Sequence, residues 1–168
     1  MVARPIIIDI EASGFGKGSY PIEIGYVDRL GKPWCRLITP SDEWVHWNNV
    51  AEELHHIKRE TLFAYGKSID YVANHLNSVF LNKTIYSDGW LQDYTWLSKL
   101  FEKANVSPHF KLEDLRTILT PHQAAIWHRT KQFILDELKI SRHRASADAK
   151  VLQLTWQKSR KQEATAYV

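Results

Sequence analysis

Pro5-Ile-Ile-Ile-Asp9-Ile-Glu11 is the stretch that decides the fold. Its residues are β-branched and nearly continuous in apolar character, which is typical of a strand buried on both faces of a sheet. Because side chains alternate along a strand, Asp9 and Glu11 share one face and Ile8 and Ile10 share the other. Two carboxylates on one buried surface predict either a multivalent cation or one protonated carboxyl group. The alternative is a strand that ends in solvated charges.

The segments that follow predict one mixed α/β domain. After a glycine-rich loop, alternation over 22–26 and a run over 34–38, joined by a turn at 29–31, predict a hairpin. A fourth strand is expected over 84–87. Helices are expected after Ser68, from Tyr94 through Phe101, after Thr120-Pro121, and over 144–160. With no repeat or linker, we expect one domain over 1–160 and a polar tail over 161–168.

Composition excludes several classes of protein. The 168 residues are 44% hydrophobic and 24% charged, which favours a globular chain over a disordered one. The single cysteine, Cys35, excludes an internal disulfide framework, and no Cys-x-x-C pair gives a zinc-finger spacing. No apolar run reaches membrane-spanning length, and Asp9 interrupts the N-terminal isoleucines, so we expect no membrane association and a cytoplasmic location. A formal charge of +3 is compatible with a polyanionic partner.

Two further acids interrupt apolar helix stripes. Apolar residues follow Asp93 and Asp148 at i+3 and i+4, so both carboxylates are expected to point inward. Acids at the ends of elements are often helix caps, and this remains the alternative to metal ligation for each of them.

His143 lies five residues before Asp148. His109 and Asp114 have the same spacing, so the spacing alone is uninformative. Only His143 precedes a series of small residues, the alanines at 145, 147 and 149, which allow close approach of a helix and a tight first turn. His143 is therefore the candidate site residue, and a surface histidine among arginines is the alternative.

Taken together, these segments resemble the three Exo motifs of the DEDDh 3′–5′ exonucleases, the group of ribonuclease T, oligoribonuclease and the polymerase III proofreading subunit. The resemblance covers nearly the whole chain and rests on Asp9-Ile-Glu11-Ala-Ser-Gly-Phe15, on Asp93 with Leu97, and on His143-x-Ala-x-x-Asp148-Ala. Pro21-Ile-Glu-Ile-Gly25 is similar to the second-strand signature of the family. Leu54-His55-His56-Ile57 is similar to its His-Gly-Ile segment near the 3′ end of the substrate.

The resemblance implies a ribonuclease-H-like fold, with a mixed five-stranded sheet flanked by helices, and an enzyme that releases nucleoside monophosphates from the 3′ end of single-stranded DNA or RNA. It implies two divalent ions, with His143 as general base for the attacking water. The metal ligands would be Asp9, Glu11, Asp93 and Asp148, which as hard oxygen donors favour Mg²⁺ or Mn²⁺. The implied substrate contacts are Ala12, Ser13, Gly14, Phe15, His55 and Ile57. Analogy with the family also suggests a homodimer.

The sequence departs from the family pattern in two places. His56 and Lys58 replace a glycine and a threonine of the His-Gly-Ile segment, and Ser87-Asp88-Gly89-Trp90 lacks the His-Asn that often precedes the second-motif aspartate. The added acid, Asp88, has two candidate roles, to tune the metals or to cap the helix that follows, and we expect the cap.

Aromatic and basic residues supply candidate contacts to nucleic acid. Trp44, Trp47 and Trp90 are candidates for base stacking, with core packing as the alternative. The candidate phosphate contacts are Lys17, Arg142, Arg144 and Lys150. Two other function classes compete with the exonuclease: a catalytically silent module that binds nucleic acid, and a protein-interaction domain. A protein-interaction domain would leave the inward-pointing acids unexplained.

Overall fold

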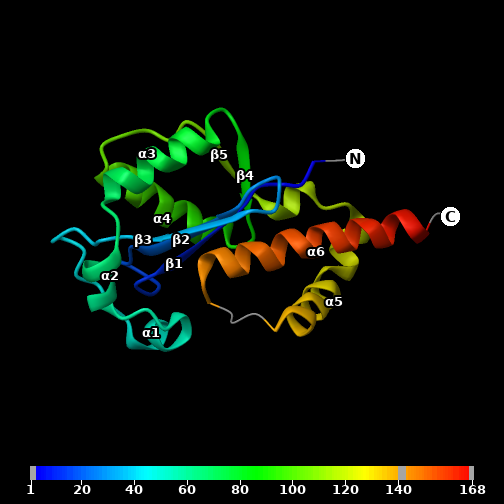
Figure 1. Cartoon of the computed structure of the whole chain (residues 1–168), viewed down its shortest axis with the longest axis horizontal. Helices are drawn as coiled ribbons and strands as arrows, with labels where there is room; N and C mark the ends of the chain where they lie inside the picture. The colour runs from blue at the N-terminus through cyan, green and yellow to red at the C-terminus, as the bar shows by residue number, and fades with distance from the viewer. Residues whose placement is uncertain (1–2, 140–142, 167–168) are drawn as a thin grey trace.

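A mixed five-stranded sheet lies between two layers of helices in the computed structural model, which describes residues 3–139 and 143–166 (Figure 1). The strand order is β3-β2-β1-β4-β5. β1 is antiparallel to β2, and β2 to β3, whereas β4 is parallel to both β1 and β5. The strands are β1 (Ile7–Ala12), β2 (Pro21–Val27), β3 (Pro33–Leu37), β4 (Thr84–Ser87) and β5 (Lys111–Asp114).

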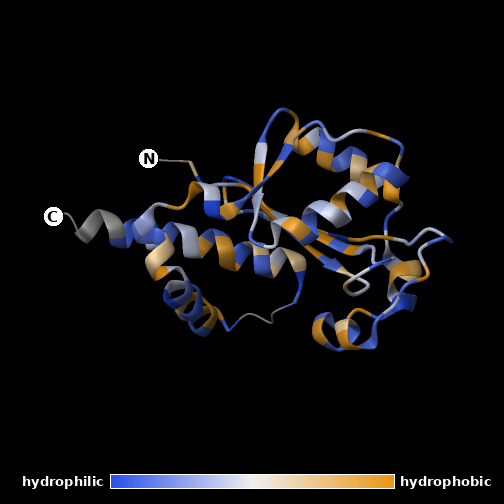
Figure 2. Cartoon of the chain, turned by 180° about the vertical axis from the view of Figure 1, so that it is seen from behind, coloured by the Kyte–Doolittle hydropathy of each residue, from blue (hydrophilic) through white to orange (hydrophobic). Residues whose placement is uncertain are grey.

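Figure 1 shows α3 and α4 on one side of the sheet and α5 and α6 on the other. The helices are α1 (Asn49–His55), α2 (Arg59–Tyr65), α3 (Ile69–Phe80), α4 (Trp90–Lys103), α5 (Pro121–Leu138) and α6 (Ala145–Ala166), with a 3₁₀ turn at Leu115–Ile118. Figure 2 shows hydrophobic and hydrophilic residues on the same helices, as expected for amphipathic helices that cover a sheet. Among the described residues, no helix combines the length and apolar character needed to cross a membrane.

β1 divides the apolar core in two. Ile8 and Ile10 belong to the larger cluster, which β1 and β2 share with α3 and α4. Ile7 belongs to a smaller cluster with Leu152 and Trp156 of α6. Asp9 and Glu11 alternate with Ile8 and Ile10, so they lie on the Ile7 side of the strand, which α6 covers. The expected division of the β1 side chains between two faces is confirmed.

The predicted helix starts after Ser68 and Thr120 are confirmed by their capping contacts, whereas the helix expected from Tyr94 begins at Trp90. Ser68 accepts a hydrogen bond from the backbone N–H of Tyr71 at the start of α3. Thr120 and Gln123 form a capping box at the start of α5, with Pro121 in the first turn.

The structure differs from the sequence expectations at several elements. α6 continues to Ala166 instead of ending at 160, because residues 161–166 contain no glycine or proline to stop a helix. β2 is buried along its whole length. The alternation of residue types over 22–26 therefore does not mark one solvent-facing and one buried side of this strand. β5 contributes one buried residue, Leu112, among charged neighbours, and no residue pattern indicated it. α1 and α2 were also not indicated.

Candidate active site

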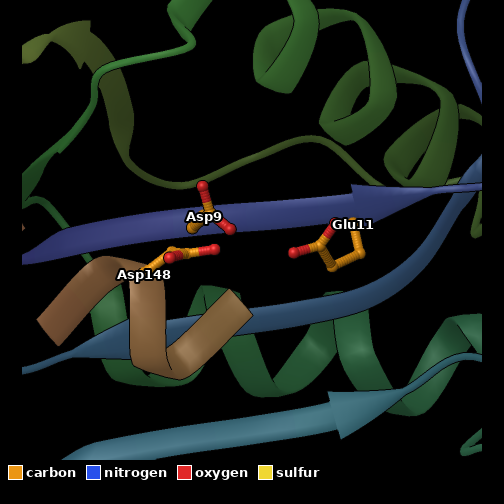
Figure 3. Close-up of side chains that lie close together, drawn as sticks. All are labelled: Asp9, Glu11 and Asp148. Atoms are coloured by element: carbon orange, nitrogen blue, oxygen red, sulfur yellow. The ribbon is translucent and has the colours of Figure 1, made fainter. Parts of the chain in front are cut away.

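Three carboxylates meet where the first turn of α6 passes over β1 (Figure 3). One oxygen each of Asp9, Glu11 and Asp148 lies within 4.8 Å of the others. Asp9 and Glu11 come from β1, and Asp148 comes from the first turn of α6. A set of three carboxylates offers the oxygen ligands that Mg²⁺ and Mn²⁺ prefer, so the donor chemistry fits a divalent cation.

Asp93 adds a fourth carboxylate near these three acids. It lies in the first turn of α4, is 3% exposed and accepts a hydrogen bond from the Ser87 hydroxyl. Its charge is one of the causes that raise the pKa of Asp9. Asp93 is thus electrostatically part of the acidic site, although it is not among the three residues whose oxygens meet.

The electrostatics of the site disfavour full ionisation. Burial raises the pKa of Asp9 well above its usual value, and repulsion from Asp93, Glu11 and Asp148 raises it further. Burial, together with Asp148 and Glu23, raises the pKa of Glu11 to about 7. Burial also raises the pKa of Asp93 to about 7, against the opposing hydrogen bond from Ser87. A divalent cation would relieve this repulsion and stabilise the charged forms.

A cleft of about 480 Å³ opens beside these acids. Apolar side chains form much of its wall, notably Leu54 of α1, Trp96 of α4 and Phe15 of the loop after β1. The Phe15 ring is 70% exposed and lies 5.8 Å from the Trp96 ring. Among the residues predicted for the site, the lining includes Asp9, Glu11, Ala12, Gly14, Phe15, His55, Asp93 and His143.

His143 lies in the turn that leads into α6. Its φ of 66° is in the left-handed region, which is uncommon for residues other than glycine. Its backbone N–H donates to Oδ2 of Asp148 at 2.9 Å, so the histidine and the metal-ligand candidate are fixed relative to each other. The His143 side chain lines the cleft.

Glu23 of β2 is a functional candidate that the sequence reasoning missed. It lies opposite Glu11 in the strand register and is fully buried. Its carboxylate accepts from Nε of Arg144 at 3.0 and 3.1 Å and from the backbone N–H of Ala145 at 2.9 Å. This contact ties the start of α6 to the sheet and thereby positions His143 and Asp148. A glutamate inside the otherwise apolar Pro21–Gly25 stretch was the signal that could have found it.

Gly25 allows the same helix to approach the sheet closely. It pairs with Asp9 in the strand register, and a Cβ at this position would lie 2.1 Å from the backbone nitrogen of Ser146. Any other residue would push the first turn of α6, with Asp148, away from β1.

The predicted substrate contacts divide into two groups. His55 lines the cleft and is 3% exposed. Its Nδ1 accepts a hydrogen bond from the backbone N–H of Ile57, so the ring proton is on Nε2. This Nε2–H has no hydrogen-bond partner among the described residues. Burial lowers the pKa of His55 and keeps the ring neutral. Ser13 and Ile57 are not in the lining: Ser13 accepts from the Tyr20 N–H, and the Ile57 side chain packs in the core.

Several basic and aromatic candidates have other partners. Arg144 pairs with Glu23, and Lys150 donates to the carbonyl of Gly31, whereas Lys17 is exposed in the glycine loop. Arg142 lies outside the described residues. The three tryptophans proposed for base stacking do not line the cleft: Trp44, Trp47 and Trp90. The tryptophan that lines it is Trp96.

The expected cap at Asp88 is wrong. The N-cap of α4 is Gly89, with no side-chain cap, and Asp88 pairs with Lys131 of α5 at 3.1 Å. The lysine ammonium gives Asp88 a charged partner in place of the helix end, and the Asp88 charge also helps to raise the pKa of Asp93 and of Asp9.

Comparisons with known proteins support the fold. No family model matches the sequence, and no curated protein sequence matches it significantly. Exonuclease I of E. coli in complex with a dA16 oligonucleotide matches with a TM-score of 0.72 and 15% identity over 96% of this chain and 41% of that chain. The zinc-bound exonuclease I complex with single-stranded DNA matches with a TM-score of 0.68 and 15% identity, over 99% of this chain and 43% of that one.

The chain shares the fold of exonuclease I. The predicted ribonuclease-H-like arrangement, a mixed five-stranded sheet flanked by helices in a single domain, is therefore confirmed. This chain spans about two fifths of the length of exonuclease I. At 15% identity the likeness establishes the fold, and any function must come from the site.

The raised pKa of Glu11 predicts how stability changes with pH in the absence of metal. An unfolded glutamate ionises near pH 4.5, whereas the folded protein keeps Glu11 protonated up to about pH 7, so the folded state binds more protons in this window. The stability of the protein in EDTA should therefore fall as pH rises from about 4.5 to 7. Glu11→Gln should be more stable than the wild type at pH 8, by on the order of 1 kcal/mol, and should lose this advantage near pH 4.5.

Denaturant unfolding at several pH values measures this effect. Glu113→Gln, at an exposed position of β5, is the matched control and should not show it. A wild-type stability that stays constant between pH 5 and 8 would contradict the assignment of Glu11 to a repulsive cluster.

The Glu23–Arg144 pair predicts an asymmetric effect of mutation. Arg144→Gln leaves a fully buried carboxylate without its cation, whereas Glu23→Gln removes the buried charge and leaves a half-exposed arginine. Arg144→Gln should therefore cost more stability, on the order of 2 kcal/mol, than Glu23→Gln. The double variant should recover part of the loss. Unfolding free energies at pH 8 test this order, and a larger loss in Glu23→Gln would refute it.

Proposed function

We propose that this chain is a divalent-metal-dependent 3′–5′ exonuclease that hydrolyses single-stranded nucleic acid to nucleoside monophosphates. The convergence of Asp9, Glu11 and Asp148 carries the proposal, together with the apolar-walled cleft that Asp9 and Glu11 line. The shared fold with exonuclease I, whose structures include complexes with single-stranded oligonucleotides, supports it.

The proposed ligands of two Mg²⁺ or Mn²⁺ ions are Asp9, Glu11, Asp93 and Asp148. When bound, the ions would supply Lewis-acid stabilisation of the charge that develops on the attacking and leaving oxygens of the phosphodiester. Glu23 and Arg144 hold the turn that carries Asp148 against the sheet, so the ligand set is in place before substrate arrives.

His143 is the proposed general base. An imidazole nitrogen can accept a proton from water, and His143 lines the cleft together with Asp9 and Glu11. Its backbone N–H bond to Asp148 ties the histidine to a proposed metal ligand, beside which the attacking water would lose its proton.

The walls of the cleft suit a terminal nucleotide whose base is not paired. Phe15 and Leu54 are exposed apolar side chains that can contact a splayed base. Nε2–H of His55 is a buried donor without a protein partner among the described residues, and it can donate to an oxygen of the nucleotide. The proposed backbone contacts are Ala12, at the end of β1, and Gly14, in the loop that follows.

The proposal predicts metal-dependent release of mononucleotides from a 3′-labelled single strand. Asp148→Asn should lower turnover with Mn²⁺ by about a thousandfold or more, because it removes a charged metal ligand, and should leave the fold intact in EDTA. Asp114→Asn removes a carboxylate that pairs with Arg116 outside the cleft and is the matched control. Wild-type protein that releases no mononucleotide with either metal would overturn the proposal, as would an Asp148→Asn variant of normal activity.

The role of His143 predicts a loss of rate without a loss of binding. His143→Ala should lower kcat by about 10²–10⁴, with little change in metal affinity. His109→Ala, which alters the exposed histidine of the other His-x₄-Asp pair, should leave kcat unchanged. Single-turnover kinetics and metal titration distinguish the two effects. Equal losses in the two variants would exclude His143 as the base.

A further inference from the structure

A second hollow, of about 660 Å³, lies at the other end of the sheet. It forms where the segment before β1, the β2–β3 turn, the α3–β4 turn and the C-terminal half of α6 come together. Figure 1 shows the N-terminal segment at the same end of the molecule as the C-terminal half of α6, away from the start of that helix. The hollow and the cleft described above share no lining residue.

Four cations from four separate segments line this hollow: Arg4, Arg29, Lys83 and Arg160. No carboxylate lines it, and none of the four cations forms a salt bridge with a described residue. The nearby acid Asp28, next to Arg29 in sequence, accepts instead from the backbone N–H groups of Leu30 and Lys32. The positive charge of the hollow is therefore not balanced from within the described chain.

The contacts that the cations do make leave donors to spare. Arg4 donates one bond to the carbonyl of Leu30, and Lys83 donates one to the carbonyl of Val79. The Arg160 guanidinium lies 5.3 Å from the centre of the Trp156 ring, which orients its planar fork at the edge of the hollow. An arginine has five N–H donors and a lysine three, so most of these donors remain available.

Neutral groups add to this donor set. Asn82, Thr84 and Tyr86 line the hollow with an amide and two hydroxyls. Trp156, 5% exposed, belongs to the same lining, and its indole N–H has no hydrogen-bond partner among the described residues. A concave surface lined by several cations and by residues with neutral donors, and by no acid, concentrates positive potential, and arginine and lysine donors suit the oxygens of phosphate groups.

We propose that this hollow is a binding site for the phosphate groups of a nucleotide ligand, separate from the catalytic cleft. The convergence of four unpaired cations with neutral donors around one cavity carries the proposal. The phosphates come either from a free nucleoside polyphosphate or from the backbone of a nucleic acid strand, which share this chemistry. The site does not depend on the proposed exonuclease activity.

Binding of inorganic tripolyphosphate and of single-stranded oligo-dT to the full chain in EDTA tests the proposal. EDTA prevents metal-dependent hydrolysis, and the change in affinity between the wild type and variants of the hollow reports on the hollow. Arg29→Gln/Arg160→Gln should weaken tripolyphosphate binding about tenfold or more, because each arginine supplies charge-assisted hydrogen bonds. Arg116→Gln/Arg129→Gln removes the same charge from exposed positions elsewhere and should change the affinity less than about twofold.

The two ligands distinguish the source of the phosphates. An equal loss of oligo-dT affinity in Arg29→Gln/Arg160→Gln assigns the hollow to a nucleic acid backbone, and a loss confined to tripolyphosphate assigns it to a free nucleotide. Equal losses in both double variants, or a wild-type protein that binds neither ligand saturably, would overturn the proposal. Thermal unfolding checks the fold of each variant, and Lys83→Gln, at an exposed position, repeats the test should Arg29→Gln/Arg160→Gln not fold.

Discussion

Carboxylates that repel one another on a buried face impose the main constraint on this molecule. Asp9 and Glu11 leave β1 on the side that α6 covers, and Asp148 approaches from that helix, so three acidic groups lie within 4.8 Å. Burial and mutual repulsion raise the pKa of Glu11 to about 7 and that of Asp9 well above its usual value. Groups free to relax would move apart or stay protonated. The surrounding elements must hold them together, and that requirement explains features of the fold that burial of apolar surface alone does not.

β2 meets most of this requirement. Its Gly25 pairs with Asp9 and leaves room for the backbone of Ser146, so the first turn of α6 reaches the sheet. Its Glu23 accepts from Arg144 and from the Ala145 N–H, so the same turn is fixed in direction as well as in distance. β2 thus determines the position of Asp148 in two ways: Gly25 has no side chain to hold α6 away, and the buried carboxylate of Glu23 binds the start of that helix. The buried charge is tolerated because Arg144 neutralises it from the surface, where the guanidinium keeps half of its contact with water.

The sequence predicted those parts of the fold and site that depend on local patterns. The alternation in β1, the caps at Ser68 and Thr120, and the inward-pointing acids all follow from periodicity and local hydrogen bonding. β5 was missed because its neighbours on the chain are charged, and its place at the sheet edge follows from pairing with β4. Contacts between distant residues were also beyond local patterns. Asp88 pairs with Lys131, which lies 43 residues away, and Glu23 with Arg144, which lies 121 residues away. In both cases a partner supplied by the tertiary fold determined the role of the acid.

The small formal charge of +3 does not show that acidic and basic residues lie at different ends of α6, with Asp148 in its first turn and Arg160 in its C-terminal half. The first turn of the helix places Asp148 at the carboxyl ends of the parallel strands β1 and β4, where ligands bind in open α/β sheets, and the helix carries Arg160 to their amino ends. Arg160 follows Asp148 by twelve residues, which at 1.5 Å per residue is about 18 Å of helix. This is more than twice the screening length of about 8 Å at physiological ionic strength, so the cations at one end have little effect on an anion at the other. The cations of the hollow and the carboxylates of the cleft therefore act on different phosphate groups, as the proposed second site requires.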